Sequence, residues 1–179
     1  MIYFEDGEVI AESGDVKVYH MGNELFLEKG PGHNLWIDTL ENKSICYQIG
    51  DLPRGNCLEL GLGLGIASQY ILSQPDVELL TTVEIDPDVI NVYNQLNESN
   101  ERHVIINADA VNYLELVNNT FDFIFMDHYS IIDEDTLDMI EYSYSTAKKV
   151  LSENGNIVVW FDDYTPTEIA DQFFKIIDL

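Results

Sequence analysis

Apolar strand-like runs alternate with helical patterns from residue 57 onward. Short continuous apolar runs predict buried strands at residues 57–60, 79–85, 103–107, 121–126 and 156–161. Apolar residues at helical spacing predict helices at 66–73, from Pro87, at 110–117, at 135–151 and from Thr165. This alternation is typical of a parallel sheet covered on both faces. It predicts an α/β fold, a Rossmann-like doubly wound sheet with its strands in the order third, second, first, fourth, fifth.

The first 45 residues have a different pattern. Strand-like runs at 9–11, 16–20, 25–27 and 35–37 are separated by turn sequences at 13–15, 22–23 and 30–32. We expect no helix of real length among them. The pattern predicts a small antiparallel β meander at 1–45, followed by the Rossmann-like domain at 46–179. Residues 46–50 would form a short helix or an extended lead into the first parallel strand.

Length and composition fit one soluble domain. The chain has 179 residues, of which 46% are hydrophobic, and no apolar run approaches the length of a membrane span. The first residues lack the basic region and cleavage site of a signal peptide, and two cysteines are too few for a disulfide framework. We therefore expect a cytoplasmic protein with no membrane partner.

Charge is the compositional outlier. Asp and Glu number 33 against 8 Lys and Arg, which gives a formal net charge of −25. Such a surface repels phosphate backbones, so we expect no nucleic-acid partner. It would attract a cationic substrate or cofactor. Because the acids are spread along the chain, solubility or adaptation to a salty environment is the favoured explanation.

A glycine-rich loop follows the first parallel strand. Gly61, Gly63 and Gly65 permit a tight turn and a close approach of ligand to backbone, and the next helix directs free N–H groups to the same place. Glu84 ends the second strand 23 residues after Gly61, near the spacing of a ribose-binding acid. A carboxylate there can accept hydrogen bonds from two vicinal hydroxyls. The alternative is a tight turn without a ligand.

These motifs resemble those of the class I S-adenosylmethionine-dependent methyltransferase superfamily. Residues 58–65 and 83–86 resemble its first and second motifs, 107–110 its third, and 121–127 its fourth strand with a terminal acid. The resemblance covers about residues 55–165 and implies S-adenosylmethionine, or its decarboxylated form, as the cofactor. A nicotinamide dinucleotide fits less well, because its fingerprint has a longer last glycine interval and Glu59 would repel a pyrophosphate.

The resemblance implies a role for each residue of the cofactor half. The loop of Gly61, Gly63 and Gly65 would line the methionine and ribose portion. Glu59 would orient that loop or meet the amino group, and Glu84 would hold the ribose hydroxyls. The adenine would be held by three residues in separate ways. They are Ile85 against one face, Asp109 accepting the amino hydrogen, and Ala110 donating its backbone N–H. Each acid has the alternative of a solvated strand end or helix cap.

The resemblance places the transferred group beside Asp127, at the end of the fourth strand. His128 is a candidate general base near neutral pH, with capping or packing as its alternative role. Tyr129 is either a substrate contact or an aromatic at the rim. These three residues are the predicted catalytic set, and we predict a methyltransferase that acts on a small molecule.

The spermidine synthase-like aminopropyltransferases are the nearest branch that the motifs suggest. They share the N-terminal meander, the second motif at 83–86 and the acid after the fourth strand. Two features of this chain depart from their pattern. Leu64 replaces an aspartate in the glycine loop, and the run 127–130 lacks a second acid. Aminopropyl transfer therefore stays an alternative, as does a non-catalytic protein that binds S-adenosylmethionine.

A second branch, the metal-dependent catechol-type methyltransferases, is also similar at a few positions. Asp127 and His128 resemble part of its metal motif, and Asp162 with Asp163 resembles its second ligand pair. These oxygens would suit Mg²⁺ as a Lewis acid, but Ser130 replaces the lysine base of that branch, and we expect no metal. The fifth strand would leave one sheet edge open, which a homodimer partner or the meander would cover.

Overall fold

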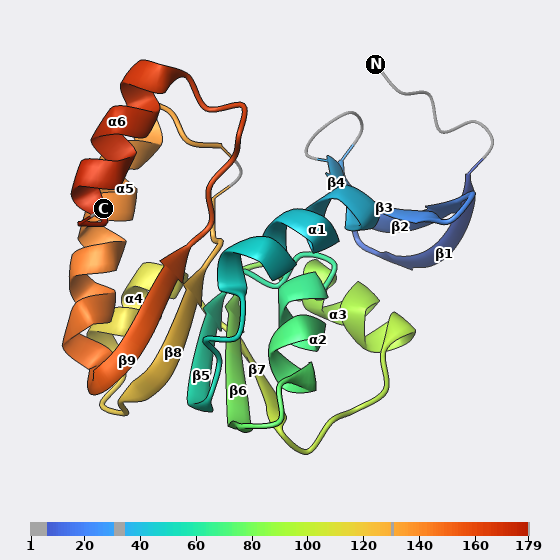
Figure 1. Cartoon of the computed structure of the whole chain (residues 1–179). Coiled ribbons are helices and arrows are strands. Elements are labelled where there is room, and N and C mark those ends of the chain that lie inside the picture. Colours follow the sequence, from blue (N-terminus) through green and yellow to red (C-terminus); the bar gives the residue numbers. More distant parts are fainter. Residues whose placement is uncertain (1–6, 31–34, 130, 179) are drawn as a thin grey trace.

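Two β-sheets organise the protein (Figure 1). The computed structural model describes residues 7–30, 35–129 and 131–178, so parts of the predicted 30–32 turn, and Ser130, lie outside the described residues. The N-terminal sheet is an antiparallel meander in the order β1-β2-β3-β4, as predicted. Its strands are β1 Glu8–Ser13, β2 Val16–Met21, β3 Glu24–Lys29 and β4 Leu35–Ile37.

The second sheet has five parallel strands in the order β7-β6-β5-β8-β9, which confirms the predicted fold class and strand order. The strands are β5 Gly55–Leu60, β6 Val77–Glu84, β7 His103–Asn107, β8 Phe121–Met126 and β9 Leu151–Val159. The helices are α1 Asp38–Ile49, α2 Ile66–Ser73, α3 Pro87–Leu96, α4 Ala110–Leu116, α5 Glu134–Ala147 and α6 Thr167–Ile176. Among the described residues, no helix is both long enough and apolar enough to cross a bilayer.

Helices cover both faces of the parallel sheet because its strands are apolar on both sides. Along β8, Phe123 and Phe125 pack with α1 and α2, whereas Ile124 and Met126 pack with α4, α5 and α6. This is the two-residue alternation of a strand, with both faces buried. The two helical layers leave the carboxyl ends of the strands as the edge where loops and ligands gather.

The meander docks on α3. Its Val16, Val18 and Leu27 are buried with Val89 and Val92 of that helix, and Figure 1 shows this contact on the β7 side of the large sheet. The meander therefore does not cover the edge of β9, at the opposite end of the strand order. Covering of that edge by a second copy stays a prediction.

The helix α1 corrects the expectation that residues 1–45 contain no helix. It begins at Asp38, within the stretch expected to form only strands, and the predicted domain boundary at residue 45 falls inside it. Asp38 and Glu41 have the spacing of a capping box, but only Ile45 and Ile49 in the C-terminal half are buried apolar residues four positions apart. Two apolar positions at helical spacing are too few to predict a helix from the sequence.

Two C-terminal boundaries also differ from the prediction. The helix expected to reach residue 151 ends at Ala147, followed by a single 3-10 turn, and β9 begins at Leu151 instead of residue 156. Gly155 lies inside β9, where the register against β8 shifts, so this glycine accompanies a strand irregularity. The last helix, expected to begin at Thr165, begins at Thr167, with Pro166 at the N-cap position and no side-chain cap.

Candidate active site

A cavity of about 410 Å³ opens at the carboxyl ends of β5, β6 and β8, a volume within the range of small-molecule sites. It lies where the strand order reverses between β5 and β8, the point at which open α/β sheets bind ligands. Ten of the eleven residues of the predicted site line it: Glu59, Gly61, Gly63, Glu84, Ile85, Asp109, Ala110, Asp127, His128 and Tyr129. Gly65 does not line the cavity, although its loop neighbours Leu64 and Ile66 do.

The three positions of the loop require glycine for different structural reasons. All have positive φ, with 96° at Gly61, 50° at Gly63 and 77° at Gly65. A Cβ on Gly61 would lie 2.1 Å from the carbonyl oxygen of Asp127, and one on Gly65 would lie 2.2 Å from the Tyr93 ring. A Cβ on Gly63 would meet no described atom within 4 Å. Gly61 and Gly65 are therefore packing positions, whereas Gly63 faces open space at the cavity.

Glu84 holds the glycine loop as well as lining the cavity. Its side chain is 9% exposed, with Oε2 accepting the backbone N–H of Leu62 at 2.9 Å and Oε1 accepting that of Asp86 at 2.8 Å. Each carboxylate oxygen has a second acceptor position. The carboxylate is thus fixed in orientation and can still accept hydrogen bonds from a ligand.

Glu59 is fully buried next to that carboxylate. Its Oε2 accepts the hydroxyls of Ser68 and Thr82, both at 2.5 Å, whereas Oε1 has no hydrogen-bond partner among the described residues. Burial raises the pKa of Glu59 to about 8, against the opposing effect of the two hydroxyls. A buried carboxyl group with one oxygen unpartnered on a cavity wall suits a cationic ligand, whose positive charge would favour the ionised form of Glu59.

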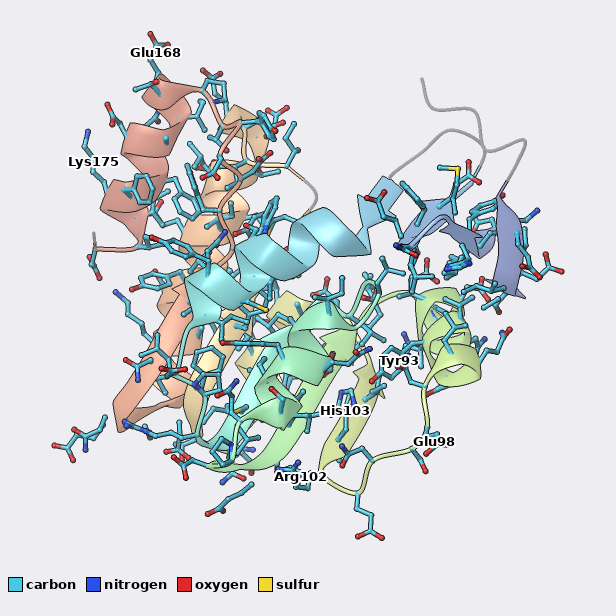
Figure 2. The ribbon with its side chains drawn as sticks, turned by 45° about the vertical axis from the view of Figure 1, so that its right-hand side comes forward. Tyr93, Glu98, Arg102, His103, Glu168 and Lys175 are labelled. Atoms are coloured by element: carbon cyan, nitrogen blue, oxygen red, sulfur yellow. The ribbon has the colours of Figure 1, made fainter. Side chains whose placement is uncertain are left out.

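A series of contacts links Glu59 through Thr82 to His103 and Tyr93. Thr82 Oγ1 lies 2.7 Å from Nε2 of His103, and the His103 ring stands edge-on to Tyr93 with their centroids 5.8 Å apart. Figure 2 shows these two side chains meeting between β7 and α3. The prediction named Glu59 but missed Ser68 and Thr82. Nothing in a lone Ser or Thr of an apolar segment marks it as a carboxylate partner before the strands are paired.

The adenine-side residues lie at the ends of β6 and β7. Ile85 is 64% exposed at the cavity mouth. Asp109 is the N-cap of α4, with Oδ1 accepting the Asn112 backbone N–H at 2.8 Å, so its expected alternative as a helix cap is present in the structure. Ala110 is buried behind it in the first turn of that helix.

Asp127 follows β8, and its backbone N–H donates to the carbonyl of Leu60 at 2.8 Å. This bond ties the acid to the start of the glycine loop. Burial raises the pKa of Asp127 to about 7. A carboxyl group with a pKa near the working pH can take up and release a proton there.

The side chains of His128 and Tyr129 each form a hydrogen bond to another part of the protein. Nε2 of His128 lies 3.1 Å from the Ser143 hydroxyl, and burial lowers the pKa of this histidine to about 4. The Tyr129 hydroxyl donates to the backbone carbonyl of Trp160, and burial raises its pKa well above the usual value. Tyr129 therefore forms a wall of the cavity with its phenol proton already committed.

Lys29 is a charged lining residue that the sequence interpretation missed. It comes from β3 of the meander, and its Nζ lies 2.6 Å from Oδ2 of Asp86, the N-cap of α3. This hydrogen bond raises the pKa of Lys29. The meander thus contributes to the cavity wall, a contact that no local pattern in residues 24–29 signals.

The acids proposed as a second ligand pair for Mg²⁺ do not line the cavity. Asp162 accepts the backbone N–H of Tyr164 at 2.9 Å, and Asp163 is exposed. Within the described part of the chain, no three His, Cys, Asp or Glu side chains gather as a candidate metal site. The catechol-type arrangement with Asp127 is therefore not formed by these residues.

Sequence comparisons find two kinds of transferase. A ribosomal RNA small subunit methyltransferase A of Wolbachia pipientis is 33% identical over 89 residues, which are 49% of this chain and 31% of that protein. A polyamine aminopropyltransferase of Oceanobacillus iheyensis is 35% identical over 81 residues, 40% of this chain and 16% of that protein. The chain thus spans less than a third of either relative. No family model matches it.

The solved structures that resemble this chain have the same sheet. Spermidine synthase from Thermotoga maritima superposes with a TM-score of 0.73 at 16% identity, over 95% of this chain and 63% of that one. The chain thus has the fold of the class I S-adenosylmethionine-dependent methyltransferase-like superfamily and is similar in sequence to two kinds of its members. An N-methyltransferase from Bradyrhizobium japonicum shares this class I fold with a TM-score of 0.58 at 15% identity, over 77% of this chain and 81% of its own.

The match to spermidine synthase includes the meander as well as the parallel sheet, because 95% coverage leaves too few residues unaligned to omit it. The predicted likeness to the spermidine synthase-like branch is therefore confirmed at the level of the fold. At these identities the structural matches show the fold alone. The residue roles rest on the geometry of the cavity.

Proposed function

We propose that the protein binds S-adenosylmethionine in this cavity and transfers its methyl group to a small-molecule acceptor. The observation that carries the proposal is the pairing of two buried acidic side chains, Glu59 and Glu84, around a glycine loop whose Gly63 opens on the cavity. Buried acids on either side of such a loop suit a cofactor that has a cationic end and a ribose diol. They do not suit a pyrophosphate.

The residues present fit the cofactor piece by piece. Glu84 would accept the ribose hydroxyls, and Glu59 Oε1, which has no described partner, would face the cationic methionine end. Asp109 and Ala110 would border the adenine. When bound, the cofactor supplies an already activated methyl group on its sulfonium. The protein has mainly to align the acceptor, exclude water and receive a proton.

Asp127 is the residue we assign to the proton. It lines the cavity at the end of β8, and its pKa of about 7 lets it accept a proton from an acceptor hydroxyl or amine near neutral pH. His128, with a pKa of about 4, is a weaker base. Of the predicted catalytic residues, Asp127 is therefore the proton acceptor, and Tyr129 shapes the site.

Aminopropyl transfer from decarboxylated S-adenosylmethionine is the second candidate. The superposition on a spermidine synthase over the meander as well as the sheet favours it. Leu64 argues against it, because this side chain lines the cavity at the place where the branch has an aspartate for the aminopropyl amine. We propose a small-molecule acceptor and no nucleic acid, on the ground of the net charge of −25, although one relative is a ribosomal RNA methyltransferase by name.

Calorimetry with three ligands tests the proposal. S-adenosylmethionine and its demethylated product S-adenosylhomocysteine should both bind, and the decarboxylated form should bind more weakly. Preference for the decarboxylated form would favour aminopropyl transfer. Binding of S-adenosylmethionine without turnover on any acceptor of a broad panel of amines and hydroxyl compounds would favour a non-catalytic binding protein. Failure of all three ligands to bind would contradict the proposal.

A further inference from the structure

His128 has one nitrogen engaged and one unpaired. It follows Asp127 on the loop after β8 and lines the cavity. Its Nε2 lies 3.1 Å from Oγ of Ser143 on α5, whereas Nδ1 is buried without a hydrogen-bond partner among the described residues. The Tyr129 ring packs edge-on against the imidazole, with the ring centroids 5.6 Å apart. The orientation of the imidazole is therefore set by its neighbours.

The Ser143 hydroxyl determines which nitrogen has the proton. Ser143 Oγ lies 2.6 Å from the backbone carbonyl oxygen of Met139, and a carbonyl can only accept. A hydroxyl has one proton, so Ser143 donates it to Met139 and can meet His128 only as an acceptor. Nε2 must then be the protonated nitrogen of the neutral ring. Nδ1 is left as a bare lone pair.

The surroundings of Nδ1 leave it available to a ligand. The hydroxyl of the neighbouring Tyr129 donates its hydrogen bond to the Trp160 carbonyl, and the adjacent Asp127 makes no hydrogen bond to Nδ1. An unpaired buried acceptor costs free energy, and the cavity that His128 lines is where a partner can come from. Because burial lowers the pKa of His128 to about 4, the ring is neutral at physiological pH and Nδ1 stays an acceptor.

We propose that Ser143 is a positioning residue that holds His128 in the Nε2–H tautomer, and that Nδ1 accepts a hydrogen bond from an N–H or O–H group of the bound ligand. The identity of that ligand rests on the function proposed above. Two sources have this chemistry: the 6-amino group of the adenine, and a donor at the position of the transferred group. The experiment below has one arm for each.

The tautomer is measured first, without any ligand. Nitrogen-15 NMR of the histidine-labelled protein should show Nδ1 of His128 unprotonated and Nε2 protonated. Ser143→Ala should shift the ring toward the opposite tautomer, and Ser143→Thr, which keeps the hydroxyl, should restore it. Thr146→Ala is the matched control, since Thr146 is buried on the same helix and donates to the Tyr142 carbonyl at 2.9 Å. A protonated Nδ1 in the unmodified protein, which needs no variant to fold, would overturn the proposal.

The ligand is tested with sinefungin and S-adenosylhomocysteine. Sinefungin has an amine where S-adenosylmethionine has its methyl-bearing sulfonium. A fall of about tenfold in sinefungin affinity alone, ~1.4 kcal/mol, on Ser143→Ala would place the donor at the transfer position. An equal fall for both ligands would assign it to the adenine amino group. Unchanged affinity for both, with Thr146→Ala also unchanged, would contradict the ligand role of Nδ1. If neither ligand binds the unmodified protein, the proposed function and this ligand role both fail, while the NMR result still decides the tautomer.

Discussion

The backbone N–H of Leu62 donates to Oε2 of Glu84 at 2.9 Å. The acid that ends β6 thus holds the loop that follows β5, and a single carboxylate joins the two motifs on which the proposed cofactor site depends. Leu62 in turn is buried against the meander. The loop is therefore fixed on one side by the sheet and on the other by the N-terminal strands.

Glu84→Ala should weaken binding of S-adenosylhomocysteine by about tenfold to a hundredfold. The change removes charge-assisted hydrogen bonds to the ribose, worth on the order of 1.5–3 kcal/mol, together with the support of the loop. Calorimetry on the folded variant measures the effect. Glu78→Ala is the control, because Glu78 lies on the same strand but is exposed. If Glu84→Ala and Glu78→Ala bind equally well, Glu84 does not touch the cofactor.

Gly63→Ala and Gly61→Ala should separate ligand contact from packing. At Gly63 the added methyl meets no described atom, so only the left-handed backbone is penalised, by roughly 1–2 kcal/mol, and cofactor affinity should fall. At Gly61 the methyl would collide with the Asp127 carbonyl, and stability should fall further. Chemical denaturation and calorimetry measure the two effects. Normal cofactor affinity in Gly63→Ala would argue against a ligand lying on this loop.

The pKa of Glu59 predicts a pH dependence of stability. Burial raises this pKa from 4.5 in the unfolded chain to about 8 in the fold. The folded protein then keeps a proton that the unfolded chain releases, so this contribution is complete below about pH 4.5 and is lost as the pH rises toward 8. Denaturation of Glu59→Gln across this range should show a flatter pH profile than the unmodified protein. An equally steep profile would mean that Glu59 is ionised in the fold.

Asp127→Asn should lower turnover at least tenfold, ~1.4 kcal/mol of transition-state stabilisation, and leave cofactor affinity nearly unchanged. The amide keeps the shape of the side chain but cannot accept the proton. Single-turnover kinetics beside calorimetry on the same sample gives both quantities. Equal losses of affinity and turnover would instead make Asp127 part of the cofactor contacts. If neither changes, the chemistry depends on other groups.

The sequence predicted the parallel sheet and its cavity because both follow from local patterns. Apolar runs such as Phe121–Met126 and the two motifs around Gly61 and Glu84 stand out without knowledge of the fold. Contacts between distant segments leave no such trace. Lys29 contacts Asp86 only because the meander docks on α3. Ser143 contacts His128 only because α5 packs beside the loop that follows β8.

The predicted ends of helices and strands were wrong where a local sequence pattern fits more than one kind of secondary structure. The helix predicted to reach residue 151 ends at Ala147, and the glycine that follows this helical pattern, Gly155, lies in β9 at a change of register. The burial of α1 depends on α2, with which it packs, so its own sequence shows little of its helical character. Tertiary packing decided these cases, and single-segment propensity could not.

A crystal structure with S-adenosylhomocysteine is the most direct test of the central claim that this cavity is the cofactor site. The account predicts the ribose hydroxyls within hydrogen-bond distance of the Glu84 carboxylate, the adenine between Ile85 and Ala110, and the sulfur on the side of Asp127. A ligand bound elsewhere, or an adenosyl group in the cavity that makes no contact with Glu84, would contradict it.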